Sequence, residues 1–138
     1  MSALRVEGGC LCGTVRYRAG GPATDPTLCH CRTCRKAAGS PVVGWATVPA
    51  AGFIFVAGRP VEYRSSPDVV RTFCGACGTP LTYTHAGLPA SIDVTLGSLD
   101  DPEAFPPADH IWTSHRLAWM ETAAALPAHA ETRPTGAS

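Results

Sequence analysis

Short runs of branched, aromatic and alternating residues recur along the chain and are separated by turn residues. Runs of this kind predict β-strands, and there are seven: 14–19 (TVRYRA), 41–48 (PVVGWATV), 53–56 (FIFV), 61–64 (VEYR), 69–73 (VVRTF), 80–85 (PLTYTH) and 91–96 (SIDVTL). In 14–19 and 80–85 the large residues alternate with polar ones, as in a sheet with one face in water. The pattern therefore predicts a mainly β fold.

Helical patterns are confined to two short stretches. Residues 32–38 (RTCRKAA) predict a helix of about two turns, which Gly39 would end in a left-handed conformation. Residues 101–105 (DPEAF) predict a helical turn with Asp101 as its N-cap and Pro102 at its first position. The fold is therefore expected to contain only short helical pieces beside its strands.

The length of 138 residues is that of one domain. We expect a single domain over 1–138, with its core at about 5–121. From 122 to 138 the chain loses strand periodicity and nearly all large apolar residues, which predicts a loose C-terminal tail. Glycine (14) and proline (13) are abundant, but 45% of the residues are hydrophobic, so many turns are favoured over disorder.

The charge balance restricts the partners. Eleven basic and eleven acidic residues give a net charge of zero, which provides no field to hold nucleic acid or an acidic membrane surface. The opening MSALRVEGGC carries charges where a signal peptide would be apolar, and no later run reaches ~18 apolar residues. We therefore expect a cytoplasmic protein whose partner is a small molecule.

The seven cysteines fall into three clusters, within GGCLCGT, CHCRTC and FCGACGT. A disulfide framework is a poor explanation, because the number is odd and the cytoplasm keeps thiols reduced. Redox use of the two C-x-x-C spacings would require a βαβ context, which the strand pattern lacks. The C-x-C spacings are awkward for disulfides but suit metal chelation.

Zinc chemistry accounts for all seven thiols. A structural zinc site has about four ligands, whereas a catalytic site has about three protein ligands and an open position. Two pairs of cysteines lie in glycine-rich turns, Cys10 with Cys12 and Cys74 with Cys77. Together they would form a four-cysteine site that closes a long loop. Metal binding at such a site is coupled to folding. The remaining Cys29, Cys31 and Cys34 would leave a position for water or a thiol substrate.

Basic residues follow the three-cysteine cluster. Arg35 and Lys36 are candidates to bind an anionic substrate, although they equally suit a solvated helix face. For Arg32 a solvated position on the helix face is the favoured interpretation. Arg64 and Arg71 are further candidates for substrate carboxylates, and Arg71 could instead support a turn.

The histidines are weaker ligand candidates than the cysteines. His30 lies between two thiols, and adjacent side chains rarely point to the same side, so we expect it not to be a ligand. His85, His110 and His115 each fit a core or turn position better than a metal site. His110 opens the apolar stretch HIW, in which Trp112 either lines a pocket or fills the core.

The cysteine motifs and their neighbours resemble a known family. GGCLCGTVRY, CHCRTCRKAAGSPVVGW, SSPDVVRTFCGACGTPLTY, IDVTLGSLDDP and HIWTSHRLAW follow the order and spacing of the glutathione-dependent formaldehyde-activating (GFA), centromere protein V-like family. The resemblance runs from about Gly8 to Trp119. It implies the β-tent fold of small antiparallel sheets, with a structural zinc at the four-cysteine site and a catalytic zinc at the three-cysteine site.

The resemblance also implies an activity. In this family's namesake reaction, glutathione and formaldehyde combine reversibly to S-(hydroxymethyl)glutathione, so the enzyme is a carbon-sulfur lyase. We accordingly expect two zinc ions per chain, the open one partly occupied because a missing ligand lowers affinity, and a thiol or thiol-aldehyde adduct as partner. The alternative is a non-catalytic zinc-binding module, a thiol carrier or a protein-interaction domain, because a fold does not determine a function.

Overall fold

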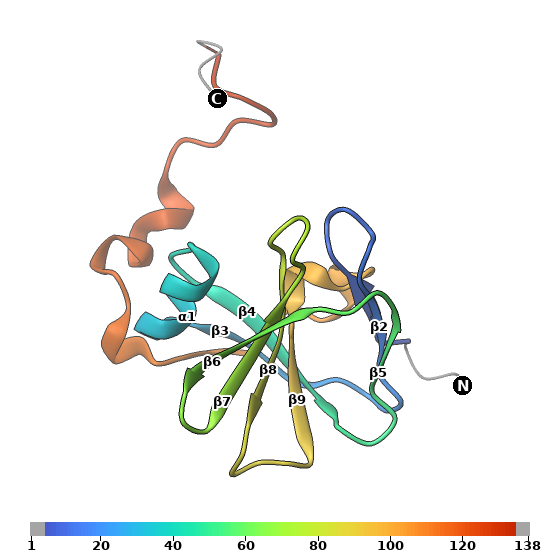
Figure 1. The fold of residues 1–138 in the computed structure, drawn as a ribbon. Coiled ribbons are helices and arrows are strands. Elements are labelled where there is room, and N and C mark those ends of the chain that lie inside the picture. Colours follow the sequence, from blue (N-terminus) through green and yellow to red (C-terminus); the bar gives the residue numbers. More distant parts are fainter. Residues whose placement is uncertain (1–4, 135–138) are drawn as a thin grey trace.

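The computed structural model describes residues 5–134 and consists of two β-sheets with short helical segments. The small sheet has the strand order β1-β2-β5, with β1 (Glu7–Gly9), β2 (Arg16–Arg18) and β5 (Ile54–Ala57). The large sheet has the order β10-β3-β4-β9-β8-β7-β6 (Figure 1). Its strands are β3 (Thr24–Cys29), β4 (Val43–Pro49), β6 (Val61–Ser66), β7 (Val69–Phe73), β8 (Pro80–His85), β9 (Ser91–Thr95) and β10 (Asp109–Ile111).

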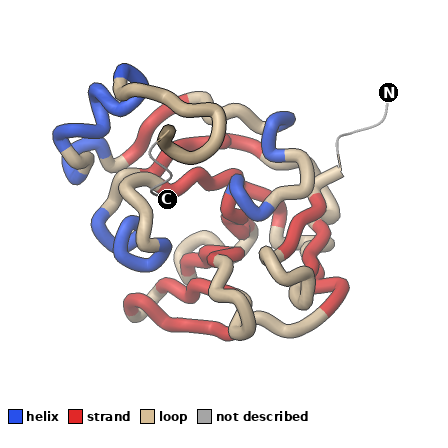
Figure 2. The backbone as a smooth tube through the Cα atoms, turned by 90° about the horizontal axis from the view of Figure 1, so that it is seen from above, coloured by secondary structure: helices blue, strands red, loops and turns tan. Residues whose placement is uncertain are grey.

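Helical segments gather on the left of Figure 2, and further short ones lie among the strands nearer its centre. They are the α-helix α1 (Arg32–Ala38) and the 3₁₀ helices η1 (Leu96–Ser98), η2 (Pro102–Ala104), η3 (Thr113–His115) and η4 (Ala118–Ala125). None of the helices within residues 5–134 has the length and apolar character that a membrane crossing requires.

Strand β4 is covered on both faces. Ala46 and Val48 belong to the main core, which lies between the two sheets, whereas Val43 and Trp45 belong to a second cluster with cysteines of the opposite face. The alternation follows from the period of two along a strand. The main core also contains Val6, Cys10, Val15, Tyr17, Cys74, Leu81, Val94, Leu96 and Leu99. One face of β4 therefore supports the fold, and the other is available to a site.

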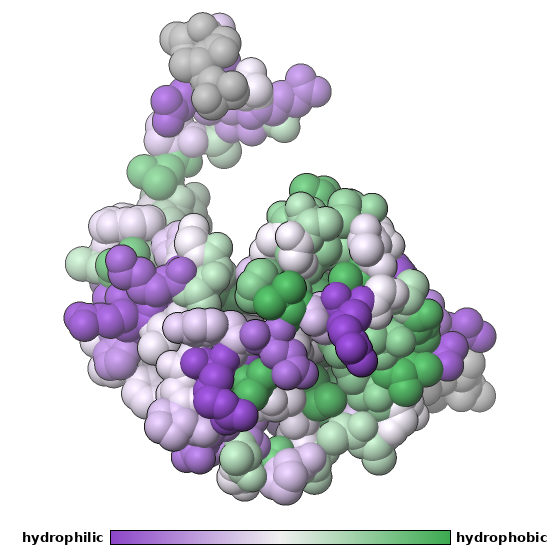
Figure 3. All heavy atoms as spheres, in the orientation of Figure 1, coloured by the Kyte–Doolittle hydropathy of each residue, from purple (hydrophilic) through white to green (hydrophobic). Residues whose placement is uncertain are grey.

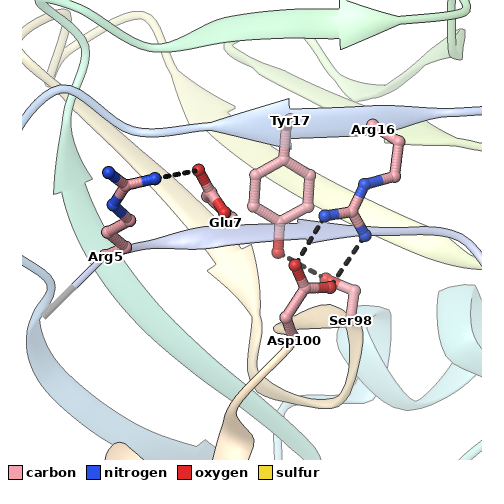
Figure 4. Close-up of polar contacts among 6 residues, drawn as sticks. All are labelled: Arg5, Glu7, Arg16, Tyr17, Ser98 and Asp100. Carbon is pink, nitrogen blue, oxygen red and sulfur yellow. Dashed lines mark hydrogen bonds and ion pairs between the residues drawn. The ribbon is translucent and has the colours of Figure 1, made fainter.

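Polar contacts connect the small sheet to the segment that follows β9 (Figure 4). The fully buried Tyr17 shares a hydrogen bond of 2.7 Å with the Ser98 hydroxyl, and burial raises the pKa of Tyr17 to about 12. Arg16 forms a two-pronged ion pair with Asp100, with donor distances of 2.7 and 2.5 Å. The hydroxyl pair is buried, whereas this ion pair is partly exposed and is screened by water.

Apolar side chains also reach the surface of the small sheet. Ile54 and Val56 of β5 are exposed. In Figure 3 apolar spheres gather on the side of the molecule that carries this sheet. Hydrophilic side chains predominate at the lower left of the same view.

The mainly β prediction is confirmed. All seven predicted strands are present, and their ends differ from the predicted ones by at most two residues. The predicted helix matches α1, and Gly39 ends it with φ 63°. Strands β1, β3 and β10 were not predicted, because β1 contains two glycines, Pro26 interrupts β3 and β10 has only three residues.

Other details differ from the expectations. Strand β10 pairs with β3 in parallel, whereas all other pairs are antiparallel. Asp101 precedes η2 but its side chain makes no capping hydrogen bond. Strand β8 was predicted to have one face in water, but neither face is fully exposed to solvent, because the adjacent Leu81 and Thr82 are both buried. Helix η4 extends to Ala125, and residues 126–134 contain no regular helix or strand.

The Tyr17–Ser98 contact gives a first prediction. Tyr17→Phe should lower the free energy of unfolding by about 1 kcal/mol, because it removes one buried hydrogen bond and little packing. Denaturant unfolding measures this change. Tyr63→Phe is the control, since Tyr63 is 61% exposed and should show almost no effect. Equal stability of both variants would contradict a stabilising role for the contact.

Candidate functional site

The structure brings four cysteines from two distant turns together. The sulfur atoms of Cys10, Cys12, Cys74 and Cys77 all lie within 4.8 Å of one another. The Cys10–Cys12 and Cys12–Cys74 sulfur distances are 3.6 and 3.8 Å. A tetrahedral zinc with Zn–S bonds of about 2.3 Å requires sulfur separations of about 3.8 Å. The four sulfurs therefore fit a closed zinc site.

Two glycines shape the turns that carry these cysteines. Gly13 and Gly78 have φ values of 79° and 82°, a region that residues with a Cβ rarely adopt. Their N–H groups donate to the carbonyls of Cys10 and Cys74 at 3.1 and 2.8 Å. In Figure 1 the two loops stand side by side at the upper end of the sheets. Both turns therefore close in the same way around the sulfur atoms.

Hydrogen bonds to Cys10 and Cys77 favour the thiolate form of these two residues. The backbone N–H of Val15 donates to Cys10 at 3.2 Å and lowers the pKa of that thiol. The Thr79 hydroxyl lies 3.3 Å from the Cys77 sulfur and, with other hydrogen bonds, lowers the pKa of Cys77 to about 5. Thiolates are the form in which cysteine binds zinc. The environment of this cluster thus suits a metal ion.

The second cluster lies where β3 passes into α1. Cys29 ends β3, Cys31 is the N-cap of α1, and Cys34 follows in the first turn of the helix. The N–H of Cys34 donates to the Cys31 sulfur at 3.2 Å, and the Cys29 and Cys34 sulfurs are 3.6 Å apart. Among the described residues this group contains three possible ligands. It thus has the donor set of an open zinc site.

Arg71 connects this cluster to the large sheet. It lies in β7, is only 8% exposed, and both terminal nitrogens approach the Cys34 sulfur at 3.7 Å. The hydrogen bond from the Cys29 thiol, with support from Arg71, lowers the pKa of Cys34 to about 5. The hydrogen bond that the Cys29 thiol donates to Cys34 raises the pKa of Cys29, and burial adds to this shift. These contacts therefore favour the thiolate form of Cys34, beside the guanidinium.

A cavity of about 1000 Å³ opens beside the three-cysteine cluster. Part of its wall is a row of residues that are direct neighbours across four strands: Thr47 on β4, Asp93 on β9, Tyr83 on β8 and Arg71 on β7. The Thr47 hydroxyl donates to Asp93 at 2.7 Å, and the Arg71 guanidinium lies 5.1 Å from the Tyr83 ring centre. The cavity thus combines the cysteines with acidic, basic and aromatic groups.

Asp93 is the acidic member of this row. Burial raises the pKa of its carboxyl, with smaller contributions in the same direction from Cys34 and Asp25, while the Thr47 hydrogen bond opposes the shift. No ion pair to Asp93 occurs within residues 5–134. Its carboxyl therefore retains a proton to higher pH than an exposed aspartate does.

The predicted cationic candidates separate into two groups. Arg32, Arg35 and Arg71 line the cavity, whereas Lys36 and Arg64 are not among its lining residues. Sequence reasoning missed several other lining residues, which are Asp25, Thr27, Trp45, Thr47, Tyr83, Asp93, Asp109, Ile111, Ser114 and Arg116. For Asp93 the sequence offered a signal, because it is a charged residue between the apolar Ile92 and Val94 in SIDVTL.

His30 lies apart from the metal-ligating groups. It is fully buried, its Nε2 lies 2.9 Å from Nδ1 of His110, and its own Nδ1 has no partner among the described residues. Burial and His110 lower the pKa of His30. His85 accepts a hydrogen bond from Gly87 in a turn. His115 lines the cavity.

The fold and the two sulfur clusters define a mainly β protein with two groups of cysteines that could hold metal ions. The chain belongs to the glutathione-dependent formaldehyde-activating enzyme family, GFA, whose model matches residues 5–115.

Two known proteins are similar to the chain. A Halomonas elongata protein named "Putative glutathione-dependent formaldehyde-activating enzyme" is 27% identical over 130 residues, covering 86% of this chain and 81% of its own length. The crystal structure of a Rhodobacter sphaeroides protein matches with a TM-score of 0.60 and 22% identity, covering 75% of this chain and 98% of that one. The second likeness concerns the fold alone.

The two clusters should respond differently to mutation. Cys74→Ser should cause a large loss of thermal stability, because it opens a site whose ligands are 62 residues apart. Cys34→Ser should leave most of the stability, because its cluster spans only residues 29–34. Thermal unfolding of the zinc-loaded variants measures both effects. Equal losses would contradict the assignment of one structural and one open site.

Proposed function

We propose that the chain is a zinc-dependent carbon-sulfur lyase acting on a thiol-aldehyde adduct, with glutathione as the thiol and formaldehyde as the aldehyde. The observation that carries the proposal is the three-cysteine cluster in the wall of a large cavity, beside Arg71. The family and its name support the same chemistry. The enzyme would act in the cytoplasm.

The proposed roles follow from the two donor sets. Cys10, Cys12, Cys74 and Cys77 would hold a structural zinc, and Cys29, Cys31 and Cys34 a catalytic one. A zinc ion bound by three cysteines supplies a Lewis acid that favours the thiolate form of a substrate thiol at neutral pH.

The chain's own residues balance charge and position the substrate. Three thiolates on a divalent cation leave a net negative charge, which Arg71 offsets from within hydrogen-bond reach of Cys34. Arg32, Arg35 and Arg116 also line the cavity and would bind the substrate's carboxylates. Lys36 is outside the lining and would contribute only through the local field.

The sheet provides the remaining contacts. Trp45 and Tyr83 pack with ring centres 5.9 Å apart and give the cavity an apolar wall, which would exclude water from part of the substrate. Asp93 and Thr47 offer a carboxyl and a hydroxyl that could hydrogen-bond to the adduct's hydroxyl. Bound in this way, the thiol and the aldehyde would be held close together, which favours formation of the carbon-sulfur bond.

NMR exchange spectroscopy of glutathione, formaldehyde and their adduct tests the proposal. The zinc-loaded chain should accelerate the exchange. Unchanged exchange rates at high enzyme concentration would contradict the lyase, and tight glutathione binding without acceleration would indicate a thiol carrier.

Arg71→Met should slow this exchange by about tenfold or more, because a buried hydrogen bond to a charged group contributes about 1.5–3 kcal/mol. Arg64→Met is the matched control, since Arg64 is exposed and donates to the Pro67 carbonyl. Zinc content and thermal unfolding establish that both variants are folded and loaded. An exchange rate equal to that of the control would contradict the proposed role of Arg71 beside Cys34.

A further inference from the structure

Backbone strain is concentrated at the cavity. Within residues 5–134, Asp25 and Trp112 are the two non-glycine residues with positive φ, at 52° and 58°, and both line the cavity. Aspartate tolerates the left-handed region because its short polar side chain can bond locally, whereas a bulky residue there is an outlier. Strained residues that persist commonly belong to functional sites. Trp112 is therefore the more informative of the two.

The position of Trp112 is fixed relative to the three-cysteine cluster. Strand β10 pairs in parallel with β3, and its last residue, Ile111, is the direct neighbour of Cys29. The Ile111 carbonyl accepts a hydrogen bond from the His30 N–H at 3.0 Å. Trp112 follows immediately, and its own carbonyl accepts the His115 N–H at 3.0 Å. The backbone of Trp112 is thus held between β10 and η3, and the residue lines the cavity that contains the cysteines.

The ring contributes little burial to the fold. Trp112 is 56% exposed, and its aromatic neighbour is His115, with ring centres 5.2 Å apart. Trp119 provides a comparison, because it is 57% exposed but does not line the cavity and has an ordinary helical position in η4. A residue that combines backbone strain with an exposed ring gains no evident stability from this conformation. Contact with a ligand would account for both features.

We infer that Trp112 is a substrate-binding residue that packs against the non-reacting part of a peptide-sized thiol. This inference rests on the proposed function and names the part of the substrate that the indole recognises. A cavity of about 1000 Å³ is larger than a two-carbon thiol requires. The flat apolar face of an indole suits the amide planes and methylene groups of a peptide. The reacting sulfur would lie at the cysteine cluster, and the rest of the peptide would extend from there across the indole of Trp112.

Trp112→Gly separates the two possible roles of this residue. Glycine adopts positive φ without strain, so the variant should unfold at the same temperature as the wild type or a higher one. Loss of the ring should weaken glutathione binding, measured calorimetrically, by about tenfold. The rate of exchange with 2-mercaptoethanol and formaldehyde should change by less than about twofold, because that thiol does not extend to the indole.

Trp119→Ala is the matched control and should leave glutathione binding unchanged. Trp112→Phe should retain part of the binding, because a smaller aromatic face remains. A lower unfolding temperature for Trp112→Gly together with unchanged glutathione affinity would overturn the inference and assign the ring a structural role. If the wild type neither binds glutathione nor accelerates exchange with either thiol, the proposed function fails as well. Acceleration by the wild type together with unaltered binding by Trp112→Gly would overturn only the inference.

Discussion

The fold depends on the close approach of four cysteine sulfurs from two turns that lie 62 residues apart. One turn connects β1 to β2 in the small sheet, and the other connects β7 to β8 in the large sheet. Four thiolates within 4.8 Å of one another would repel strongly in a partly buried environment. A divalent cation bound by the four sulfurs would remove that repulsion and make the contact a cross-link between the sheets. The hydroxyl pair of Tyr17 and Ser98 adds a second connection.

This connection leaves the opposite face of the large sheet available for chemistry. Along β4, Ala46 and Val48 face the core between the sheets, while Trp45 and Thr47 line the cavity. The same alternation places Arg71 and Tyr83 on the cavity face of β7 and β8. Stability and the candidate site therefore use opposite faces of the same strands. Substitutions at the site should accordingly be tolerated better than substitutions in the core.

Features of the site that depend on short stretches of sequence could be predicted. The division of seven cysteines into four and three follows from their spacing, and Gly39 marks the end of α1. The cavity could not be predicted in the same way, because it depends on strand register. Thr47, Asp93, Tyr83 and Arg71 become neighbours only after four strands have paired. The parallel contact of β10 with β3 likewise joins segments about 80 residues apart in the chain.

The positions of individual residues were hardest to predict where the sequence allowed two environments for the same side chain. Arg71 was a candidate for either a substrate carboxylate or a turn, and the structure places it against the Cys34 sulfur and the Tyr83 ring. For Trp112 the sequence allowed either a pocket or a core position; in the structure the residue lines the cavity and is 56% exposed. Both outcomes depend on contacts between segments that the spacing of a single motif does not describe.

Zinc X-ray absorption spectroscopy combined with zinc content distinguishes one closed and one open site from other arrangements, because it counts the sulfur neighbours of the metal. At full loading the chain should hold two zinc ions. Their average should be about 3.5 sulfur neighbours at about 2.3 Å, midway between a closed four-cysteine site and an open three-cysteine site. A single zinc at saturation, or two zinc ions that each have four sulfur neighbours, would contradict the presence of one closed and one open site.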